Sequence, residues 1–203
     1  MNQELIVLAS GSPRRQELLR QINLHYEVRP ADVDETRLPG ESPPDYASRI
    51  ALDKAERVAS VLNDAGDRII LAADTAVVLG EEVIGKPADA DVAASMLRRL
   101  SGREHQVVTA VAGIRGQRRI VELSVSSVAF RPISEPEISN YVASGEPMGK
   151  AGAYAIQGFA AIFTERLAGS YSGVMGLPLF ETARLLAQLD LVVQPVAGSA
   201  GDE

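Results

Sequence analysis

Two long segments of β type lie in the middle of the chain. Residues 106–115 and 118–130 alternate on either side of a turn at Gly116, which is typical of two antiparallel strands. Near the N-terminus, a short apolar run over residues 5–9 is followed at once by a turn, a helical pattern and a second extended segment over residues 26–29. A strand, helix and strand in this order favour parallel pairing. The two signals together predict one mixed sheet.

The remaining elements are predicted from apolar spacing, proline and glycine. Helices are expected over residues 13–22, 44–63, 89–100, 134–143 and 178–189. We also expect a last strand over residues 160–165 and a loop over residues 169–176. Helices on both faces of one mixed sheet, an α/β fold, are the simplest packing. The chain shows no internal repeat and no long linker, which predicts a single domain over residues 1–195 and a disordered tail over residues 196–203.

Composition excludes several classes of protein. The chain has 203 residues, no cysteine and a formal net charge of −7. The lack of cysteine excludes thiol catalysis, disulfides and thiolate metal sites. The negative charge argues against a protein that coats nucleic acid, because such proteins need a positive surface. The N-terminus lacks signal-peptide features, and its apolar run is too short to span a bilayer. The default expectation is a cytoplasmic protein without a membrane partner.

A candidate anion site lies where the first strand gives way to the first helix. Ser10, Ser12, Arg14 and Arg15 stand at this junction. Backbone N–H groups at a helix N-terminus favour an anion, and two guanidinium groups add bidentate donors for phosphate oxygens. The alternative is an ordinary capped helix with two solvated arginines.

Asp74 interrupts an apolar run that extends from residue 68 to residue 79. A buried carboxylate without a partner is costly. We therefore expect Asp74 at a strand end, facing a cavity, as a general base or a metal ligand. The alternative is an aspartate that caps the next turn.

Several further polar residues are candidates. Glu35 lies in a polar, proline-rich segment that reads as a surface loop, and loops often carry functional residues. Lys54 lies on a partly apolar helix face, where it either meets a buried anion or extends its stem to solvent. Lys86 and Lys150 lie in glycine-containing turns, where a lysine points at a ligand or is simply solvated. Both histidines, His25 and His105, are expected to be structural because neither has a metal-binding spacing.

Taken in order, these motifs resemble the Maf family of nucleotide pyrophosphatases. The resemblance covers nearly the whole chain and rests on Leu8 to Arg15, Asp34-Glu35-Thr36, Lys54-Ala55, Ala73-Asp74-Thr75, Gly85-Lys86-Pro87, Leu100-Ser101-Gly102 and further matches over residues 105–111, 146–158 and 176–178. It implies an elongated mixed sheet flanked by helices, with a cleft between two lobes, similar to inosine triphosphate pyrophosphatases. It also implies a cytoplasmic enzyme that cleaves nucleoside triphosphates between the α and β phosphates with a divalent cation, Mg²⁺ or Mn²⁺.

The resemblance assigns roles by motif. Asp74 would accept a proton from water, and Glu35 would help it to hold the metal ion or the water. Lys86 would act beside them and, with Arg15 and Lys54, would bind the triphosphate, while Ser10 and Ser12 would add phosphate contacts. The base would be read by Arg14, Thr75 and Gln157. By this resemblance, these three residues place the chain in the subgroup that favours dTTP and UTP. An amide can meet the donor and acceptor edge of thymine or uracil, which gives a physical reason for that preference.

Two alternatives stay open at this point. One keeps the enzyme but changes the substrate to 7-methyl-GTP or another modified purine nucleotide. The other is a nucleotide-binding regulator of septum formation that does not turn its ligand over. A nucleoside triphosphate is the expected partner in each case, nucleic acid is not, and a homodimer is expected because the family often forms dimers.

Overall fold

The computed structural model describes residues 5–62 and 68–195. The strands are β1 (Ile6–Leu8), β2 (Tyr26–Val28), β3 (Ile70–Leu79), β4 (Glu82–Ile84), β5 (Glu104–Arg115), β6 (Arg118–Phe130) and β7 (Thr164–Ala168). The α-helices are α1 (Pro13–Gln21), α2 (Pro43–Ala59), α3 (Ala90–Leu100), α4 (Glu135–Ala143), α5 (Tyr171–Met175) and α6 (Leu179–Gln188), with 3₁₀ turns at Ala151–Ala153 and Phe159–Phe163.

One mixed sheet organises the molecule, as the sequence predicts. Its strand order is β2-β1-β3-β5-β6-β7, and β4 pairs with β3 off this path. β1 is parallel to both β2 and β3, whereas β3, β5 and β6 are antiparallel neighbours. The hairpin of β5 and β6 turns at the predicted position, where Arg115 pairs with Arg118.

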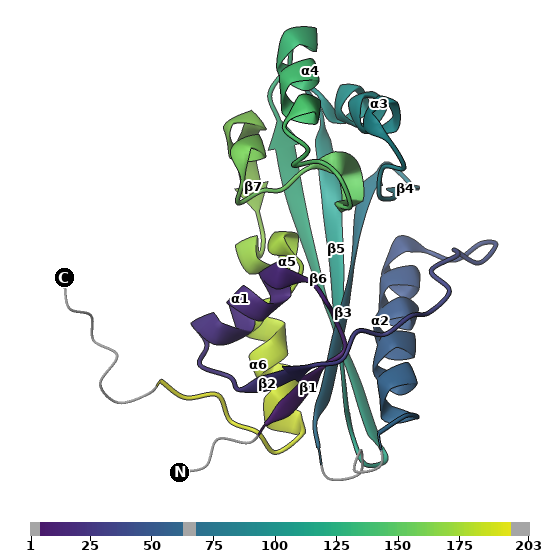
Figure 1. Cartoon of the computed structure of the whole chain (residues 1–203), viewed down its shortest axis with the longest axis vertical. Helices are drawn as coiled ribbons and strands as arrows, with labels where there is room; N and C mark the ends of the chain where they lie inside the picture. Colours follow the sequence, from purple (N-terminus) through teal and green to yellow (C-terminus); the bar gives the residue numbers. More distant parts are fainter. Residues whose placement is uncertain (1–4, 63–67, 196–203) are drawn as a thin grey trace.

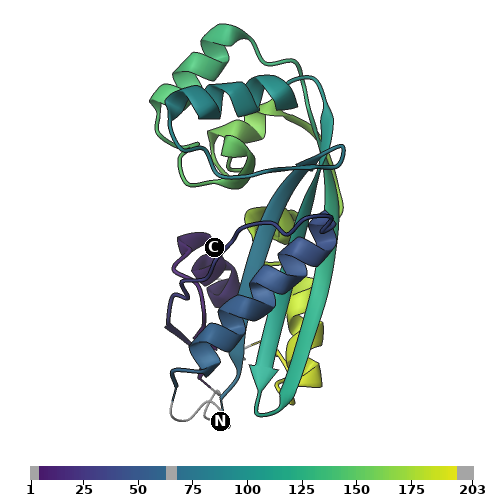
Figure 2. The same ribbon diagram turned by 90° about the vertical axis from the view of Figure 1, so that its right-hand side faces the viewer.

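The long strands β3, β5 and β6 run through two lobes of an elongated molecule (Figures 1 and 2). In the first lobe, α2 packs on one face of the sheet, and α1 and α6 pack on the other. In the second lobe, α3, α4 and the 3₁₀ turn at Phe159–Phe163 surround a separate apolar core that includes Phe130, Tyr141 and Phe163. The predicted α/β class, elongated sheet and two-lobed shape are confirmed.

Residues 159–168 differ from the prediction. The expected strand over residues 160–165 is wrong, because β7 begins only at Thr164 and Phe159–Phe163 forms a 3₁₀ turn. Burial gives the reason: Ala160 and Phe163 are both buried, whereas Ile162 between them is 54% exposed. A spacing of three buries one face of a helical turn, whereas a strand would bury alternate residues.

Residues 169–176 are also more ordered than predicted. The expected loop contains the short helix α5, which begins after Ser170 and ends at Gly176. The Ser170 hydroxyl accepts a hydrogen bond from the Gly173 N–H, and Gly176 takes the left-handed conformation, with φ of 114°. These are ordinary signals for a helix start and stop, but they enclose only one turn.

The other helices begin and end close to the predicted residues. α4 begins with a capping box between Ser134 and Glu137, and Asp89 caps α3 by accepting from the Val92 N–H. α2 ends at Ala59, before the predicted end at residue 63, which lies outside the described residues, as does the predicted tail over residues 196–203. No helix in the described ranges is long and apolar enough to cross a bilayer.

Candidate functional site

A pocket of about 400 Å³ lies between the two lobes. The first lobe contributes the turn between β1 and α1, the loop before α2 and the middle of that helix, and the second lobe contributes Lys86 and residues 149–157. β3 and the end of α5 complete its lining. All the predicted site residues line this pocket: Ser10, Ser12, Arg14, Arg15, Glu35, Lys54, Asp74, Thr75, Lys86 and Gln157. The structure therefore brings together residues that are spread over nearly 150 positions of the chain.

The pocket opens along one edge of β3. On this edge, β1 pairs with β3 as far as Leu71, and β4 pairs with it from Val77 onward. Asp74 and Thr75 lie between these two pairings, while β5 pairs with both of them on the other edge. Neighbouring strand residues point to opposite faces of a sheet. An interrupted edge lets a single pocket reach both side chains.

The position of Asp74 in its strand differs from the prediction. It lies in the middle of β3, opposite Ala110 of β5, and not at a strand end. Its side chain nevertheless faces the pocket, where it is 6% exposed. Asp74 reaches the pocket because no strand pairs with this part of the β3 edge, and not because β3 ends there.

Lys54 connects the two candidate acidic residues. Its Nζ lies 2.7 Å from Asp74 Oδ1 and 2.6 Å from Glu35 Oε1. Lys86 Nζ lies 2.9 Å from the second oxygen of Glu35. We call these four residues the ion cluster. Lys54 is 8% exposed, so the alternative of a stem that extends to solvent is wrong.

The cluster fixes the charge state of Glu35. Burial acts to raise the pKa of this carboxyl, but hydrogen bonds and charges from Lys54 and Lys86 outweigh burial and lower the pKa to about 2. Glu35 is therefore a carboxylate throughout the neutral range. A carboxylate in this charge state can hold a cation or orient a water molecule.

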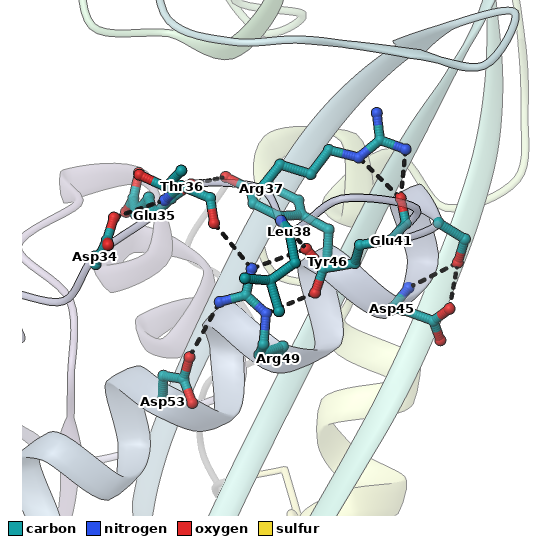
Figure 3. A network of polar contacts seen from close by, with 11 residues as sticks. Asp34, Glu35, Thr36, Arg37, Leu38, Glu41, Asp45, Tyr46, Arg49 and Asp53 are labelled. Atoms are coloured by element: carbon teal, nitrogen blue, oxygen red, sulfur yellow. Dashed lines mark hydrogen bonds and ion pairs between the residues drawn. The ribbon is translucent and has the colours of Figure 1, made fainter.

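A polar network holds the Glu35 loop on α2 (Figure 3). The Tyr46 hydroxyl donates to the Glu35 carbonyl over 3.0 Å. Arg49 donates to both oxygens of the Glu41 carboxylate, over 2.6 and 2.8 Å, and also to the Thr36 carbonyl. Because α2 carries Lys54 as well, one helix sets the positions of both Glu35 and its partner.

Arg15 joins the turn after β1 to the rest of the pocket. Its guanidinium donates to the Gly176 carbonyl over 2.8 Å, to Ser10 Oγ over 3.1 Å and to Thr75 Oγ1 over 3.5 Å. Burial lowers its pKa, against the raising effect of the Asp74 charge. The structure therefore places Thr75 against Arg15, whereas the sequence grouped Thr75 with Arg14.

Ser10 and Ser12 take different positions. Ser10 is buried, and its hydroxyl accepts from the Ser12 N–H as well as from Arg15. Ser12 occupies the N-cap of α1 without a capping hydrogen bond from its side chain. The Ser12 hydroxyl is thus available to a ligand.

A second set of lining residues has no opposite charge in contact. We call Arg14 and Lys150 the unpaired group, because neither of them forms an ion pair within the described ranges. Burial lowers the pKa of both Arg14 and Lys150, and their mutual repulsion lowers that of Lys150 further. Two neighbouring cations in one pocket favour an anionic ligand.

Gln157 lies in a loop that is pinned on both sides. The Ala155 N–H donates to the Tyr141 hydroxyl over 3.2 Å, and the Phe159 N–H donates to Glu146 Oε2 over 3.1 Å. The Tyr141 hydroxyl in turn donates to Glu146 Oε1 over 2.8 Å. These contacts fix the backbone on each side of Gln157 while its amide stays exposed to the pocket.

The two histidines play no direct part in the pocket. His105 is 2% exposed, and its Nε2 lies 2.9 Å from the Tyr154 hydroxyl inside the core of the second lobe. His25 is exposed just before β2. Neither lines the pocket, in agreement with the expected structural roles.

The sequence analysis missed the residues that hold the site residues in place. Tyr46, Arg49, Tyr141 and Glu146 all act on loops of the pocket from a helix or its end. Their partners are mostly backbone groups, which leave no trace in side-chain patterns. Thr109 was also missed, although it had a signal like that of Asp74: it is a hydroxyl inside the apolar run of β5.

Known proteins resemble this chain in sequence over almost its whole length. The family described as Maf-like protein matches residues 5–189. The chain belongs to the Maf family. Among its relatives, the dTTP/UTP pyrophosphatase of Chromobacterium violaceum is 51% identical over 189 residues, which cover 92% of this chain and 96% of the relative. The dTTP/UTP pyrophosphatase of Xanthomonas campestris is 54% identical over 184 residues, which cover 90% and 97%.

Solved structures resemble this Maf protein more distantly. The Staphylococcus aureus Ham1 protein aligns with a TM-score of 0.45 and 19% identity, over 63% of this chain and 72% of its own. A nucleoside-triphosphatase or dITP/XTP pyrophosphatase from Mycobacterium abscessus aligns with a TM-score of 0.45 and 16% identity, over 95% and 100%. Membership of the Maf family rests on the family match over residues 5–189 and on the sequence relatives.

Proposed function

We propose that this Maf protein is a nucleoside triphosphate pyrophosphatase that hydrolyses dTTP and UTP to the monophosphate and pyrophosphate in the cytoplasm. The names of its relatives support this substrate choice. The observation that carries the proposal is the ion cluster: one buried lysine holds two carboxylates at a pocket whose other charged lining residues are all cations, namely Arg14, Arg15, Lys86 and Lys150.

Asp74 is the proposed proton acceptor. Lys54 contacts its Oδ1, while Oδ2 forms no hydrogen bond with any residue in the described part of the chain. Oδ2 can therefore take a proton from a water molecule in the pocket. The water oxygen then adds to the α-phosphorus, the bond from this phosphorus to the oxygen that bridges it to the β-phosphorus breaks, and pyrophosphate leaves with the electron pair of that bond.

The cations of the pocket bind the triphosphate in this proposal. Arg15, Lys54 and Lys86 neutralise phosphate charge, and the Ser12 hydroxyl and the first N–H groups of α1 add donors. Positioning and charge neutralisation account for most of the rate in phosphoryl transfer. The local excess of Lys and Arg is what allows a protein of net charge −7 to hold a polyanion.

The donor set also fits a divalent cation. The described residues contain no group of three or more acidic or histidine side chains that could hold a metal ion alone. Asp74 and Glu35 supply two carboxylates, and Mg²⁺ and Mn²⁺ are commonly held by one or two carboxylates together with substrate phosphates. When bound, such an ion would neutralise charge that develops on the phosphate oxygens.

Arg14, Thr75 and Gln157 are proposed to read the base. Gln157 is exposed at the pinned loop, so its amide can meet both a donor and an acceptor of a pyrimidine ring. Thr75 offers a hydroxyl from β3 to the same pocket.

A substrate panel tests the proposal. Pyrophosphate release would be measured for dTTP, UTP, dCTP, CTP, dGTP, GTP and 7-methyl-GTP with Mg²⁺ or Mn²⁺. We expect the highest kcat/KM for dTTP and UTP. Preference for 7-methyl-GTP would overturn the substrate choice, and binding of nucleotides without pyrophosphate release would favour a regulator. Light scattering in the same buffer would test the proposed homodimer.

A further inference from the structure

Both backbone anchors of the loop that carries Gln157 lead to one carboxylate. We call residues 155–159 the Gln157 loop. Glu146 lies just after α4 and outside the pocket lining. Its Oε2 accepts from the Phe159 N–H over 3.1 Å, and its Oε1 accepts from the Tyr141 hydroxyl over 2.8 Å. That hydroxyl in turn accepts from the Ala155 N–H over 3.2 Å. Glu146 therefore holds the loop on both sides of Gln157.

The Glu146 carboxylate also packs directly against the backbone of this loop. A side-chain carbon on Gly158 would lie 2.6 Å from the carboxyl carbon of Glu146, which is too close for two atoms that are not bonded. Any larger residue at position 158 would therefore push the carboxylate away. The backbone angle φ of Gly158 is −101°, which other residues adopt readily. Glycine is needed here for the close approach of Glu146 and not for the shape of the chain.

The apolar core of the second lobe fixes the other end of this network. Tyr141 lies on α4 and is 2% exposed. Its ring meets that of Phe163 edge to face, with the centroids 5.3 Å apart. Directly after α4, Gly145 takes the left-handed conformation, with φ of 76°, and the chain turns so that Glu146 reaches the Tyr141 hydroxyl. Core packing therefore sets the position of Glu146, and Glu146 sets that of the loop.

The charge of Glu146 acts on this network and on the pocket. Burial and the hydrogen bond to Glu146 raise the pKa of Tyr141, so its hydroxyl stays protonated and donates to the carboxylate at neutral pH. In the pocket, burial and the charge of Arg14 lower the pKa of Lys150, while the negative charge of Glu146 acts in the opposite direction. Glu146 therefore lies behind the wall that carries Lys150 and Gln157.

We propose that Glu146 is a positioning residue that sets the base preference of the pocket through Gln157. The inference rests on the proposed function, in which the Gln157 amide meets the pyrimidine ring. A hydrogen-bonding side chain selects one base only if its backbone is held in place, because a loose loop can turn its amide toward another ring. The residues proposed to bind the triphosphate, Arg15, Lys54 and Lys86, lie on other segments of the chain.

The substitution Glu146→Gln tests the proposal with a side chain of the same size. An amide has one acceptor atom and one donor atom, so it can accept from Tyr141 or from Phe159 but not from both. We expect KM for UTP to rise by about tenfold with little change in kcat. The ratio of kcat/KM for UTP to that for CTP should fall. Inorganic tripolyphosphate has no base, so its inhibition constant should stay at the wild-type value.

Two further variants make this comparison sharper. Gly158→Ala pushes the carboxylate away from the loop without removing it, and should change KM and the UTP to CTP ratio in the same direction as Glu146→Gln. Glu165→Gln is the matched control, because Glu165 is exposed on β7 of the same lobe and lies outside the pocket lining. It should leave all these values unchanged.

A double-mutant cycle with Gln157→Ala decides whether Glu146 acts through Gln157. The double variant should discriminate between UTP and CTP no worse than Gln157→Ala alone, since two residues that act through one contact are not additive. The inference is wrong if the two effects add fully, or if Glu146→Gln weakens UTP and tripolyphosphate alike. No pyrophosphate release from any triphosphate by the wild type would refute the proposed function, and this inference with it.

Discussion

The ion cluster and the unpaired group line the same pocket but differ in how their charges are satisfied. Lys54, Asp74, Glu35 and Lys86 neutralise one another through contacts of 2.6 to 2.9 Å. Arg14 and Lys150 lie near each other, and burial lowers the pKa of both. The first set is therefore assembled before a ligand arrives. The second set gains its counter-charge only when an anionic ligand binds.

This difference separates two tasks of the site. Groups that act on a reacting bond need fixed positions, because small displacements cost much of the rate. Groups that bind a substrate can leave charge unsatisfied, since the ligand itself relieves the repulsion. We therefore expect changes in the ion cluster to affect stability and turnover, and changes in the unpaired group to affect substrate affinity.

The largest expected effect is that of Lys54→Met. Asp74 is 6% exposed, and loss of its partner leaves a buried carboxylate without compensation. Removal of one partner from a buried ion pair costs about 3 to 5 kcal/mol of unfolding free energy. Lys150→Met is the matched control and should change this free energy by less than about 0.5 kcal/mol. Urea unfolding of both variants checks the comparison, and equal losses would remove the distinction between the two sets.

Acid should weaken the core of the second lobe and the ion cluster in different pH ranges. Burial lowers the pKa of His105, behind the pocket residue Tyr154, from 6.5 to about 4. Between these values the unfolded chain binds more protons, so stability falls as the pH drops from 6.5 to 4, by about 3 kcal/mol. The lowered pKa of Glu35, about 2 against 4.5, places the loss from the ion cluster below pH 4.5.

The variant His105→Gln separates these two ranges. It keeps a polar partner for Tyr154 but does not titrate. Its unfolding free energy should change less between pH 6.5 and pH 5 than that of the wild type, and the two proteins should lose stability alike below pH 4. If the unfolding free energy of the variant changed with pH as steeply as that of the wild type between pH 6.5 and pH 5, His105 would not be the source of this pH dependence.

Loosening the Glu35 loop should have an intermediate effect, on the turnover rate. Arg49→Met removes the guanidinium that holds Glu41 and the Thr36 carbonyl. Glu35 would then be less well placed, and kcat should fall by about tenfold with little change in KM. Arg37→Met is the matched control, because Arg37 is exposed and, among the residues that the structure describes, donates to this segment only at the Glu41 carbonyl. Similar kinetics for both variants would argue against positioning by Arg49.

The smallest expected effect comes from the unpaired group. Arg14→Met or Lys150→Met should raise KM by severalfold and leave kcat nearly unchanged, since each removes one cation from the binding side. Wild-type KM should rise with added salt more steeply than KM of either variant. Steady-state kinetics at two salt concentrations measure both effects, and a fall in kcat alone would place these residues with the ion cluster.

The sequence predicts the long elements well because their signals are local. The alternation over residues 106–115 and 118–130 corresponds to β5 and β6. The short elements were harder: the apolar residues around Phe163 fit a strand or a helical turn, and only burial decides between them. α5 is a single turn, which a sequence pattern cannot separate from a loop.

For the site, the sequence indicated which residues are unusual but not how they meet. Asp74 stood out in an apolar run, yet its position depends on where β1 and β4 stop pairing with β3. The contacts of Lys54 with Glu35 and Asp74 span about 20 residues in each direction along the chain and require the packing of α2 on the sheet. The Thr75–Thr109 pair likewise depends on strand register.

The central claim is that the ion cluster performs hydrolysis with Asp74 as the proton acceptor. Its most direct test is pyrophosphate release from dTTP by Asp74→Asn, which keeps the size of the side chain and its contact with Lys54 but removes the basic oxygen. We expect turnover to fall by at least about a hundredfold, with nucleotide binding retained and circular dichroism unchanged. Wild-type turnover in a folded Asp74→Asn protein would contradict the account.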